Sequence, residues 1–246
     1  MRNLKWLILA SLFFIVAGPA FAYHPLSTDD PGTTDQRHFE LEWGNDFIWP
    51  DGRMDEASGY LALKAGLAPG LEFDTALGFA YSMNSGHENV SGFGDAEVAL
   101  KWRFLGDNEG PYNLGIEVVT LLPSGETAKG LSEGDTIIPA ALLFGSAGKG
   151  PFRALWNTGV IFVPDANDLL LYGLALEYKA TDDFALVGEI FSETDIELAG
   201  NDNPLEARVG ALYSAADWLT LSAGFGVGLT DASHDYHFTF ATLIGW

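Results

Sequence analysis

Apolar and polar side chains alternate along most of this chain, in runs of roughly ten residues. The run at 71–81 places Phe73 and Leu77 on one face and Glu72 and Asp74 on the other. A period of two residues is the period of a β-strand, and a run of roughly ten residues lets a tilted strand cross a bilayer. One face of such a strand contacts lipid and the other faces the lumen of a barrel. The alternation therefore predicts membrane-spanning strands.

The number of alternating runs is even, and bacterial outer-membrane barrels have an even number of strands. We therefore predict an all-β fold, a closed antiparallel transmembrane β-barrel of about 12 strands over residues 38–246. Pro139 lies inside one run, where it removes a ladder hydrogen bond, so a bulge is expected there. The predicted strands are 39–49, 57–67, 71–81, 95–104, 112–118, 136–146, 152–162, 170–179, 183–192, 204–214, 218–228 and 236–246.

The connections and the aromatic residues support the same fold. Tight connections near 68–70 and 180–182 alternate with long polar ones at 82–92, 123–135 and 193–203, as in outer-membrane barrels, whose short turns are periplasmic. A soluble β-sandwich is the alternative, disfavoured because the outward apolar faces continue through nearly every run. Aromatic residues near run ends, which favour membrane–water interfaces, are Trp43, Trp49, Tyr81, Trp102, Tyr112, Trp156, Tyr178, Tyr213 and Trp218.

The first residues are typical of a secretory signal. Arg2 and Lys5 precede a short apolar run at 7–16, and small residues near Ala22 offer a cleavage site. We predict a signal peptide at 1–22, with an uncleaved anchor as the alternative, and a location in the outer membrane of a Gram-negative bacterium. Residues 23–37 would form either a periplasmic lead-in to the barrel or a plug in its lumen.

Charge and cysteine content exclude several functions. The formal net charge is −22 and the chain has no cysteine. Nucleic-acid binding needs clustered Lys and Arg, so no nucleic-acid partner is expected. Disulfide frameworks, thiolate metal sites and cysteine nucleophiles are excluded.

The chain ends in an alternating run that closes on Trp246. This run resembles the terminal strand that the bacterial barrel-assembly machinery reads, a carboxyl-terminal aromatic preceded by alternating apolar residues. The resemblance implies that machinery as a partner, beside outer-membrane lipid and lipopolysaccharide. The apolar face consists of Tyr236, Phe238, Phe240, Thr242, Ile244 and Trp246.

Two segments resemble a known family. They are 24–33, with the sequence HPLSTDDPGT, followed by Phe39-Glu40-Leu41-Glu42, and 92–104, with the sequence GFGDAEVALKWRF. Both are similar to the outer-membrane transporter family known as MetA-pathway of phenol degradation, over essentially the whole chain after residue 22. The resemblance implies a barrel that passes small, hydrophobic or aromatic solutes, and it implies no site residues.

The inward face of the predicted barrel carries charges of both signs. If 71–81 and 95–104 pair, Glu72 lies opposite Arg103 and Asp74 opposite Lys101, with Glu117 diagonal to Lys101. These charges form either a polar constriction that filters solutes or a salt-bridge ladder that seals the lumen. The predicted lumen residues are Glu72, Asp74, Asp95, Glu97, Lys101, Arg103, Glu117, Arg153, Glu177, Lys179, Glu189, Glu206 and Arg208.

Apolar side chains also fall on the inward face. They fit a path for a greasy solute, and they fit an inward plug equally well. They are Leu121, Leu155, Ile161, Phe191 and Leu212.

Signals for catalysis or metal binding are weak. His234-Asp235 resembles the His–Asp pair of omptin proteases only as a dipeptide, and Ser222 and Ser233 lack a nucleophile elbow. Acids in the expected external loops lack a calcium-loop spacing; they are Glu126, Glu133, Asp135, Asp165, Asp168, Asp195, Glu197 and Asp202. No catalytic residue, metal site or cofactor is predicted.

Three functional hypotheses remain. The first is a channel or transporter in which small solutes diffuse passively through a narrow charged lumen, as in porins. The second is a lipid-active or proteolytic barrel enzyme, which would depend on His234 and His237. The third is a closed barrel with a structural or recognition role.

Overall fold

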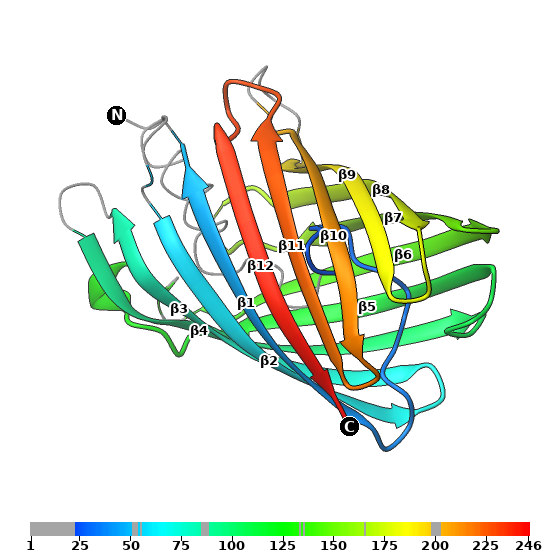
Figure 1. The fold of residues 1–246 in the computed structure, drawn as a ribbon. Coiled ribbons are helices and arrows are strands. Elements are labelled where there is room, and N and C mark those ends of the chain that lie inside the picture. The colour runs from blue at the N-terminus through cyan, green and yellow to red at the C-terminus, as the bar shows by residue number, and fades with distance from the viewer. Residues whose placement is uncertain are drawn as a thin grey trace.

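In the computed structural model, twelve antiparallel strands pair in sequence order and form one closed barrel, in which β12 pairs with β1 (Figure 1). This confirms the predicted fold class. The strands are β1 (Phe39–Trp49), β2 (Glu56–Ala68), β3 (Leu71–Asn84), β4 (Asn89–Leu105), β5 (Tyr112–Leu122), β6 (Ile138–Lys149), β7 (Phe152–Ile161), β8 (Leu169–Lys179), β9 (Phe184–Asp195), β10 (Glu206–Ala216), β11 (Leu219–Gly228) and β12 (Tyr236–Gly245).

The predicted signal peptide, 1–22, lies outside the described residues. Among the residues that are described, no helix has both the length and the apolar character needed to span a membrane. The structure describes residues 23–50, 54, 56–84, 89–132, 134, 136–164, 166–197 and 203–246.

Alternation along each strand separates a lipid-facing surface from the lumen. In β4, Leu100 and Trp102 are half exposed, whereas the alternate residues Ala99 and Lys101 are buried. Because every second side chain of a strand points the same way, one strand supplies both the apolar exterior and the polar interior. Seven of the predicted interface aromatics are exposed: Trp43, Tyr81, Trp102, Tyr112, Tyr178, Tyr213 and Trp218.

Two expected details of the strands are wrong. β3 and β4 continue to Asn84 and Asn89, through residues that we expected to form a long loop. No bulge occurs at Pro139, because the pairing of β6 with β5 and β7 is continuous. Pro139 is the second residue of β6, and its carbonyl accepts the Phe162 N–H at 2.9 Å. A proline at a strand start sacrifices little of the hydrogen-bond ladder.

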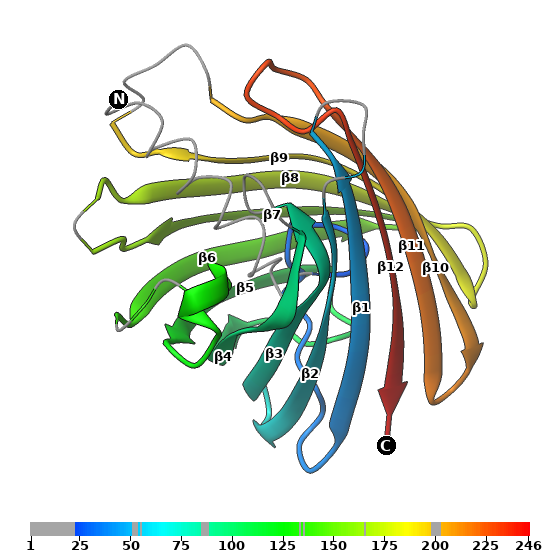
Figure 2. The ribbon, with the colours of Figure 1, turned by 90° about the vertical axis from the view of Figure 1, so that its left-hand side faces the viewer.

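The segment before β1 runs inside the barrel. It is drawn in deep blue in Figures 1 and 2, where it lies within the ring of strands and then leaves at the end that holds the C-terminus. That end carries the short turns, such as the one between Ala68 and Leu71. In outer-membrane barrels this is the periplasmic side.

Candidate functional site

Residues 23–34, here called the inner segment, bond to the inner face of several strands. The carboxylate of Glu189 on β9 accepts the backbone N–H of Ser27 and of Thr28, each at 2.7 Å. All three residues are buried. A carboxylate that accepts two backbone N–H groups makes charge-assisted bonds, which are stronger than neutral ones.

Arg208 on β10 binds the start of the inner segment. Its guanidinium donates to the Pro25 carbonyl at 2.9 Å and to Glu206 at 2.7 Å. The same group contacts the His237 ring at 2.7 Å, and the other ring nitrogen of His237 lies 2.8 Å from Asp46. This network joins β1, β10 and β12 to the segment.

Lys101 on β4 binds the middle of the inner segment, with its Nζ 2.7 Å from the Asp29 carboxylate. Burial raises the pKa of Asp29 to about 6, although the Lys101 charge opposes that shift. Glu72 on β3 accepts the Thr34 N–H at 2.5 Å. Arg103 donates to the Pro31 carbonyl at 3.3 Å.

Arg153 on β7 forms a third anchor. Its guanidinium lies 3.3 Å from Asp30 and 2.9 Å from Glu177. Glu177 in turn accepts the Tyr23 hydroxyl at 2.6 Å. Burial alone would raise the pKa of Asp30, but the nearby cations, Arg153 first among them, hold it below its ordinary value.

His24 contacts hydroxyl groups on two strands. Its Nδ1 lies 2.6 Å from Ser222 Oγ on β11, and its Nε2 lies 2.6 Å from Thr239 Oγ1 on β12. Burial lowers the pKa of His24 to about 4, against the raising effect of Glu42 and Asp46. The imidazole is therefore neutral at pH 7, when one ring nitrogen donates and the other accepts.

The inner segment separates two spaces in the lumen. The space toward the long loops is called here the upper chamber. The second space lies toward the short turns. His24 and Asp29 line both spaces. Barrels with few strands are filled by their side chains, and barrels with many strands leave an aqueous channel. A barrel of twelve strands is intermediate in size, which fits a lumen that is divided into two spaces.

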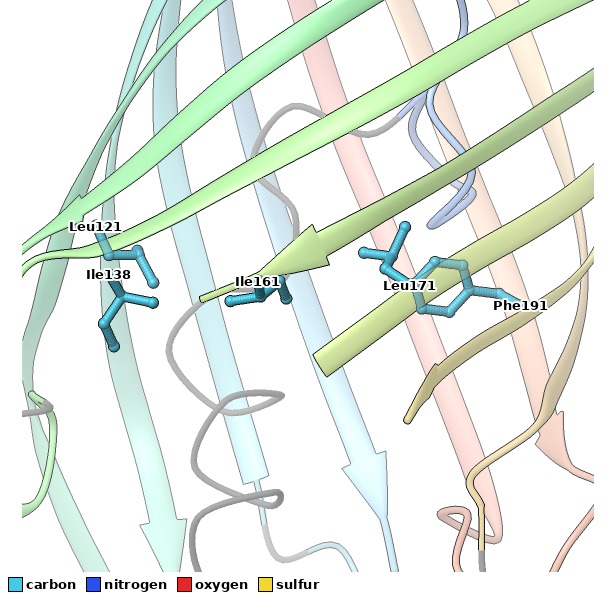
Figure 3. Packing of buried hydrophobic residues seen from close by; sticks show 5 residues of the cluster. All are labelled: Leu121, Ile138, Ile161, Leu171 and Phe191. Carbon is cyan, nitrogen blue, oxygen red and sulfur yellow. The ribbon is translucent and has the colours of Figure 1, made fainter. Parts of the chain in front are cut away.

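One wall of the upper chamber is apolar. Its buried residues come from five consecutive strands, β5 to β9, and they form one cluster near the long-loop end (Figure 3). Partly buried apolar side chains extend the cluster. A concave apolar wall beside a few polar groups is the usual form of a small-molecule site. The buried cluster consists of Leu121, Ile138, Ile161, Leu171 and Phe191.

The predicted cross-strand pairing is wrong by two residues. Glu72 pairs with Lys101 in the register, not with Arg103, and Lys101 pairs directly with Glu117. Asp74 lies opposite Ala99, not Lys101. A shift of two residues keeps every side chain on its own face, so the alternation did not distinguish the two registers. The lysine ammonium nevertheless bonds to the inner segment instead of either strand neighbour.

Most of the predicted lumen residues face the interior, but two play other parts. Lys179 is exposed at the end of β8, so it joins no group with Glu177 or Glu189. Asp95 accepts the backbone N–H of Ser124 and Gly125 at 2.9 and 2.8 Å, and so holds the β5–β6 loop against β4. Of the five predicted inward apolar residues, Leu121, Ile161 and Phe191 belong to the apolar wall, whereas Leu155 and Leu212 lie in the cluster around Leu26 of the inner segment.

Several residues of the lumen wall were not predicted from the sequence. Tyr60 donates to Glu42 at 2.5 Å, and Lys64 lies 3.2 Å from the same carboxylate. Asp46 and His237 pair across the β1–β12 junction. The two-residue period could have found all of these, because each shares the inward face of its strand.

Among the residues that the structure describes, the contacts do not form a recognisable catalytic centre. Both ring nitrogens of His24 contact hydroxyls, so no carboxylate orients the imidazole behind Ser222. His234 lies in the β11–β12 loop, whereas His237 points into the barrel. Within the described part of the chain, no group of three or more His, Asp or Glu residues is placed to hold a metal ion. The loop acids Glu133, Asp135, Asp165 and Asp202 lie outside it.

The chain matches no known family model, and no curated protein matches it in sequence. Its fold is similar to that of several solved channels. The COG4313 outer membrane channel from Pseudomonas putida F1 shares 14% identity, with 88% of this chain and 98% of that chain covered and a TM-score of 0.67. The KdgM porin shares 11% identity, with 83% and 98% covered and a TM-score of 0.60.

A third likeness is to the CymD monoaromatic hydrocarbon channel, with 9% identity, 85% of this chain and 88% of that chain covered, and a TM-score of 0.50. At such identities the likeness concerns the fold. The closed twelve-stranded barrel, its apolar exterior and these neighbours define the class of the protein, which is an outer-membrane β-barrel.

Proposed function

We propose that this protein is an outer-membrane channel through which small, apolar or aromatic solutes diffuse passively. The observation that carries the proposal is the upper chamber, a space inside a closed barrel with an apolar wall on one side. A concave space lined mainly by apolar side chains, with a few polar groups, is the usual form of a small-molecule site. The names of two structural neighbours, a hydrocarbon channel and a porin, support a channel as the starting hypothesis.

The inner segment acts in this proposal as a plug that narrows the lumen between the two spaces. It is bonded to β9 and β10 by charge-assisted hydrogen bonds and to β4 and β7 by ion pairs. The charged lumen residues predicted from the sequence then serve mainly to seat the plug, and solutes pass beside it. The resemblance to the MetA-pathway of phenol degradation family supports aromatic solutes and stays a prediction.

A closed barrel is the second candidate, and the same anchors favour it. If no gap opens beside the inner segment, the lumen conducts nothing, and the charges act as a seal. An enzymatic role has no comparable support in the geometry of the described residues.

Planar-bilayer recording of the purified protein, with solute uptake into liposomes as a second readout, separates these candidates. A channel gives discrete conductance steps and faster uptake of a small aromatic solute than protein-free liposomes show. Absence of both conductance and uptake would remove the channel proposal and leave the closed barrel.

A further inference from the structure

Two buried carboxyl groups in the upper chamber have no partner among the described residues, and a third, Glu193, also lacks one but is only partly buried. Glu97 on β4 and Glu117 on β5 both line the chamber, and they are 6% and 2% exposed. The Oε1 atom of Glu117 is fully buried without a hydrogen bond, and no bond or ion pair to the Glu97 carboxyl occurs in the described part of the chain. The charged form of a buried carboxyl is unfavourable without a partner. A cationic ligand placed between these two groups would stabilise their charged form.

The cations of the inner wall are already engaged. Lys101 is the register partner of Glu117, but its ammonium lies 2.7 Å from Asp29. Lys64 is paired with Glu42, and the remaining paired cations, Arg153 and Arg208, hold other carboxylates within 4 Å. No described basic side chain is therefore within ion-pair distance of Glu97 or Glu117.

Acids outnumber bases among the buried residues that the structure describes. Buried lysines and arginines are limited to Lys101, Arg103 and Arg208. A confined lumen with an excess of one charge attracts the opposite charge and repels its own. The buried acids are Asp29, Glu42, Glu56, Glu72, Asp74, Asp95, Glu97, Glu117, Glu177, Glu189 and Glu206.

The two free carboxyls adjoin the apolar wall. Glu97 pairs in the register with Leu121, and Glu117 pairs with Leu142; both leucines belong to or pack against that wall. A molecule whose apolar body rests on the wall can therefore place a charged end between β4 and β5. Neither an anion nor a purely apolar molecule would satisfy the carboxyls.

We propose that the upper chamber binds small apolar solutes that carry an ammonium group, with the cation at Glu97 and Glu117 and the apolar body on the Leu121–Phe191 side of the chamber. This inference rests on the proposed channel function, because it names the class of solute that the channel prefers. Aromatic amines and quaternary ammonium compounds fit it, whereas aromatic carboxylates are disfavoured.

The test compares two aromatic ions of opposite charge, benzyltrimethylammonium and phenylacetate, at pH 7. Their relative permeability is obtained from reversal potentials in planar bilayers, and saturable binding of benzyltrimethylammonium to the protein in detergent is measured by calorimetry. We expect wild type to prefer the cation by about tenfold, as rings of charged side chains do in pores. The variant Glu97→Gln/Glu117→Gln should lose both the preference and the binding.

A matched control is Glu109→Gln/Glu197→Gln, which removes two exposed acids and leaves the chamber intact. This control should keep the preference of wild type. Heat-modifiable migration on gels verifies that each variant is folded, and the single Glu97→Gln and Glu117→Gln variants replace the double variant if it fails that check.

The outcomes separate this inference from the channel proposal. Conductance with no cation preference, or a preference that survives the loss of both carboxyls, would overturn the inference and leave the channel in place. If wild type binds benzyltrimethylammonium saturably, the Glu97→Gln/Glu117→Gln variant does not, and no variant conducts, the ligand class is supported and the channel proposal is removed. Absence of saturable binding together with absence of conductance would overturn both.

Discussion

In the middle of the barrel, the Lys101 ammonium lies 2.7 Å from the Asp29 carboxylate, and each side chain is only 5% exposed. The two residues are far apart in the sequence and join a wall strand to the inner segment. A buried pair of this kind contributes little net stability, but losing one partner leaves an uncompensated charge. The position of the inner segment therefore depends on charges of the wall.

Substituting Lys101→Met should release the inner segment. The unpaired Asp29 carboxylate is expected to cost about 3–5 kcal/mol, because it stays buried without its cation. Hydrogen–deuterium exchange of the amides in 24–34 should become faster, while exchange in the strands stays slow. Lys149→Met, at an exposed position, is the control, and equal protection of the segment in both variants would contradict the anchoring role.

Substituting Glu189→Gln should loosen Ser27 and Thr28. The neutral amide has one acceptor oxygen for two N–H groups, and losing a charge-assisted bond costs roughly 1.5–3 kcal/mol. Because the chain has no cysteine, a Ser27→Cys background reports this change directly through its reaction with a thiol reagent. Labelling should accelerate about tenfold or more.

The matched control for Glu189→Gln is Glu193→Gln. This residue also lines the upper chamber from β9, but no hydrogen bond or ion pair joins it to the inner segment in the described structure. Similar labelling rates for the two variants would show that Glu189 does not hold the segment.

The inner segment should respond to pH in opposite directions in two variants. When the inner segment is bound to the barrel wall, the pKa of His24 is lowered to about 4. His24 in a released segment therefore binds a proton more readily than His24 in a bound one. Binding of the segment to the wall consequently weakens as pH falls from 6.5 to 4. The pKa of Asp29 is raised to about 6, so its effect has the reverse sign over the same range.

The variant Asp29→Asn keeps only the pH dependence that comes from His24, so its inner segment should be released on acidification. His24→Gln leaves the Asp29 effect, and its segment should be held more firmly at pH 5 than at pH 7. The labelling rate of Ser27→Cys, measured against pH, reports both effects. The profiles of the two variants are compared with the wild-type profile, to which the groups that face His24 also contribute; these are Glu42, Asp46, Arg208 and His237. Parallel pH profiles in the two variants would contradict the assignment.

Filling the upper chamber should block passage. Ala140 lines the chamber, so Ala140→Trp should reduce conductance severalfold without unfolding the barrel. The neighbouring Ala141 is exposed on the lipid-facing side of β6, and Ala141→Trp is the control. If both substitutions leave the conductance unchanged, solutes do not pass through this chamber.

The sequence predicted the barrel because the two-residue period decides, strand by strand, which side chains face inward. Leu100 and Lys101 fall on opposite faces, as expected. The period gives no register, however, since a shift of two residues keeps every side chain on its own face. That is why Glu72 was placed opposite Arg103 and is found opposite Lys101.

The two-residue period does not place the inner segment, for which a periplasmic lead-in and a lumen plug both remained open. This segment has no regular period, and its position depends on contacts such as Arg208 with the Pro25 carbonyl, which join residues far apart in the chain. Lys179 was misassigned for a related reason. Its parity matches that of Glu177, but parity does not show where the strand leaves the lumen.

If solutes cross the lumen beside a plug formed by the inner segment, removing the plug should widen their path. Single-channel recordings compare the full chain with a variant that lacks residues 23–34. We expect small conductance steps for the full chain and clearly larger ones for the shortened variant, because the segment separates the two spaces. Equal conductance in the two proteins, or none in either, would contradict it.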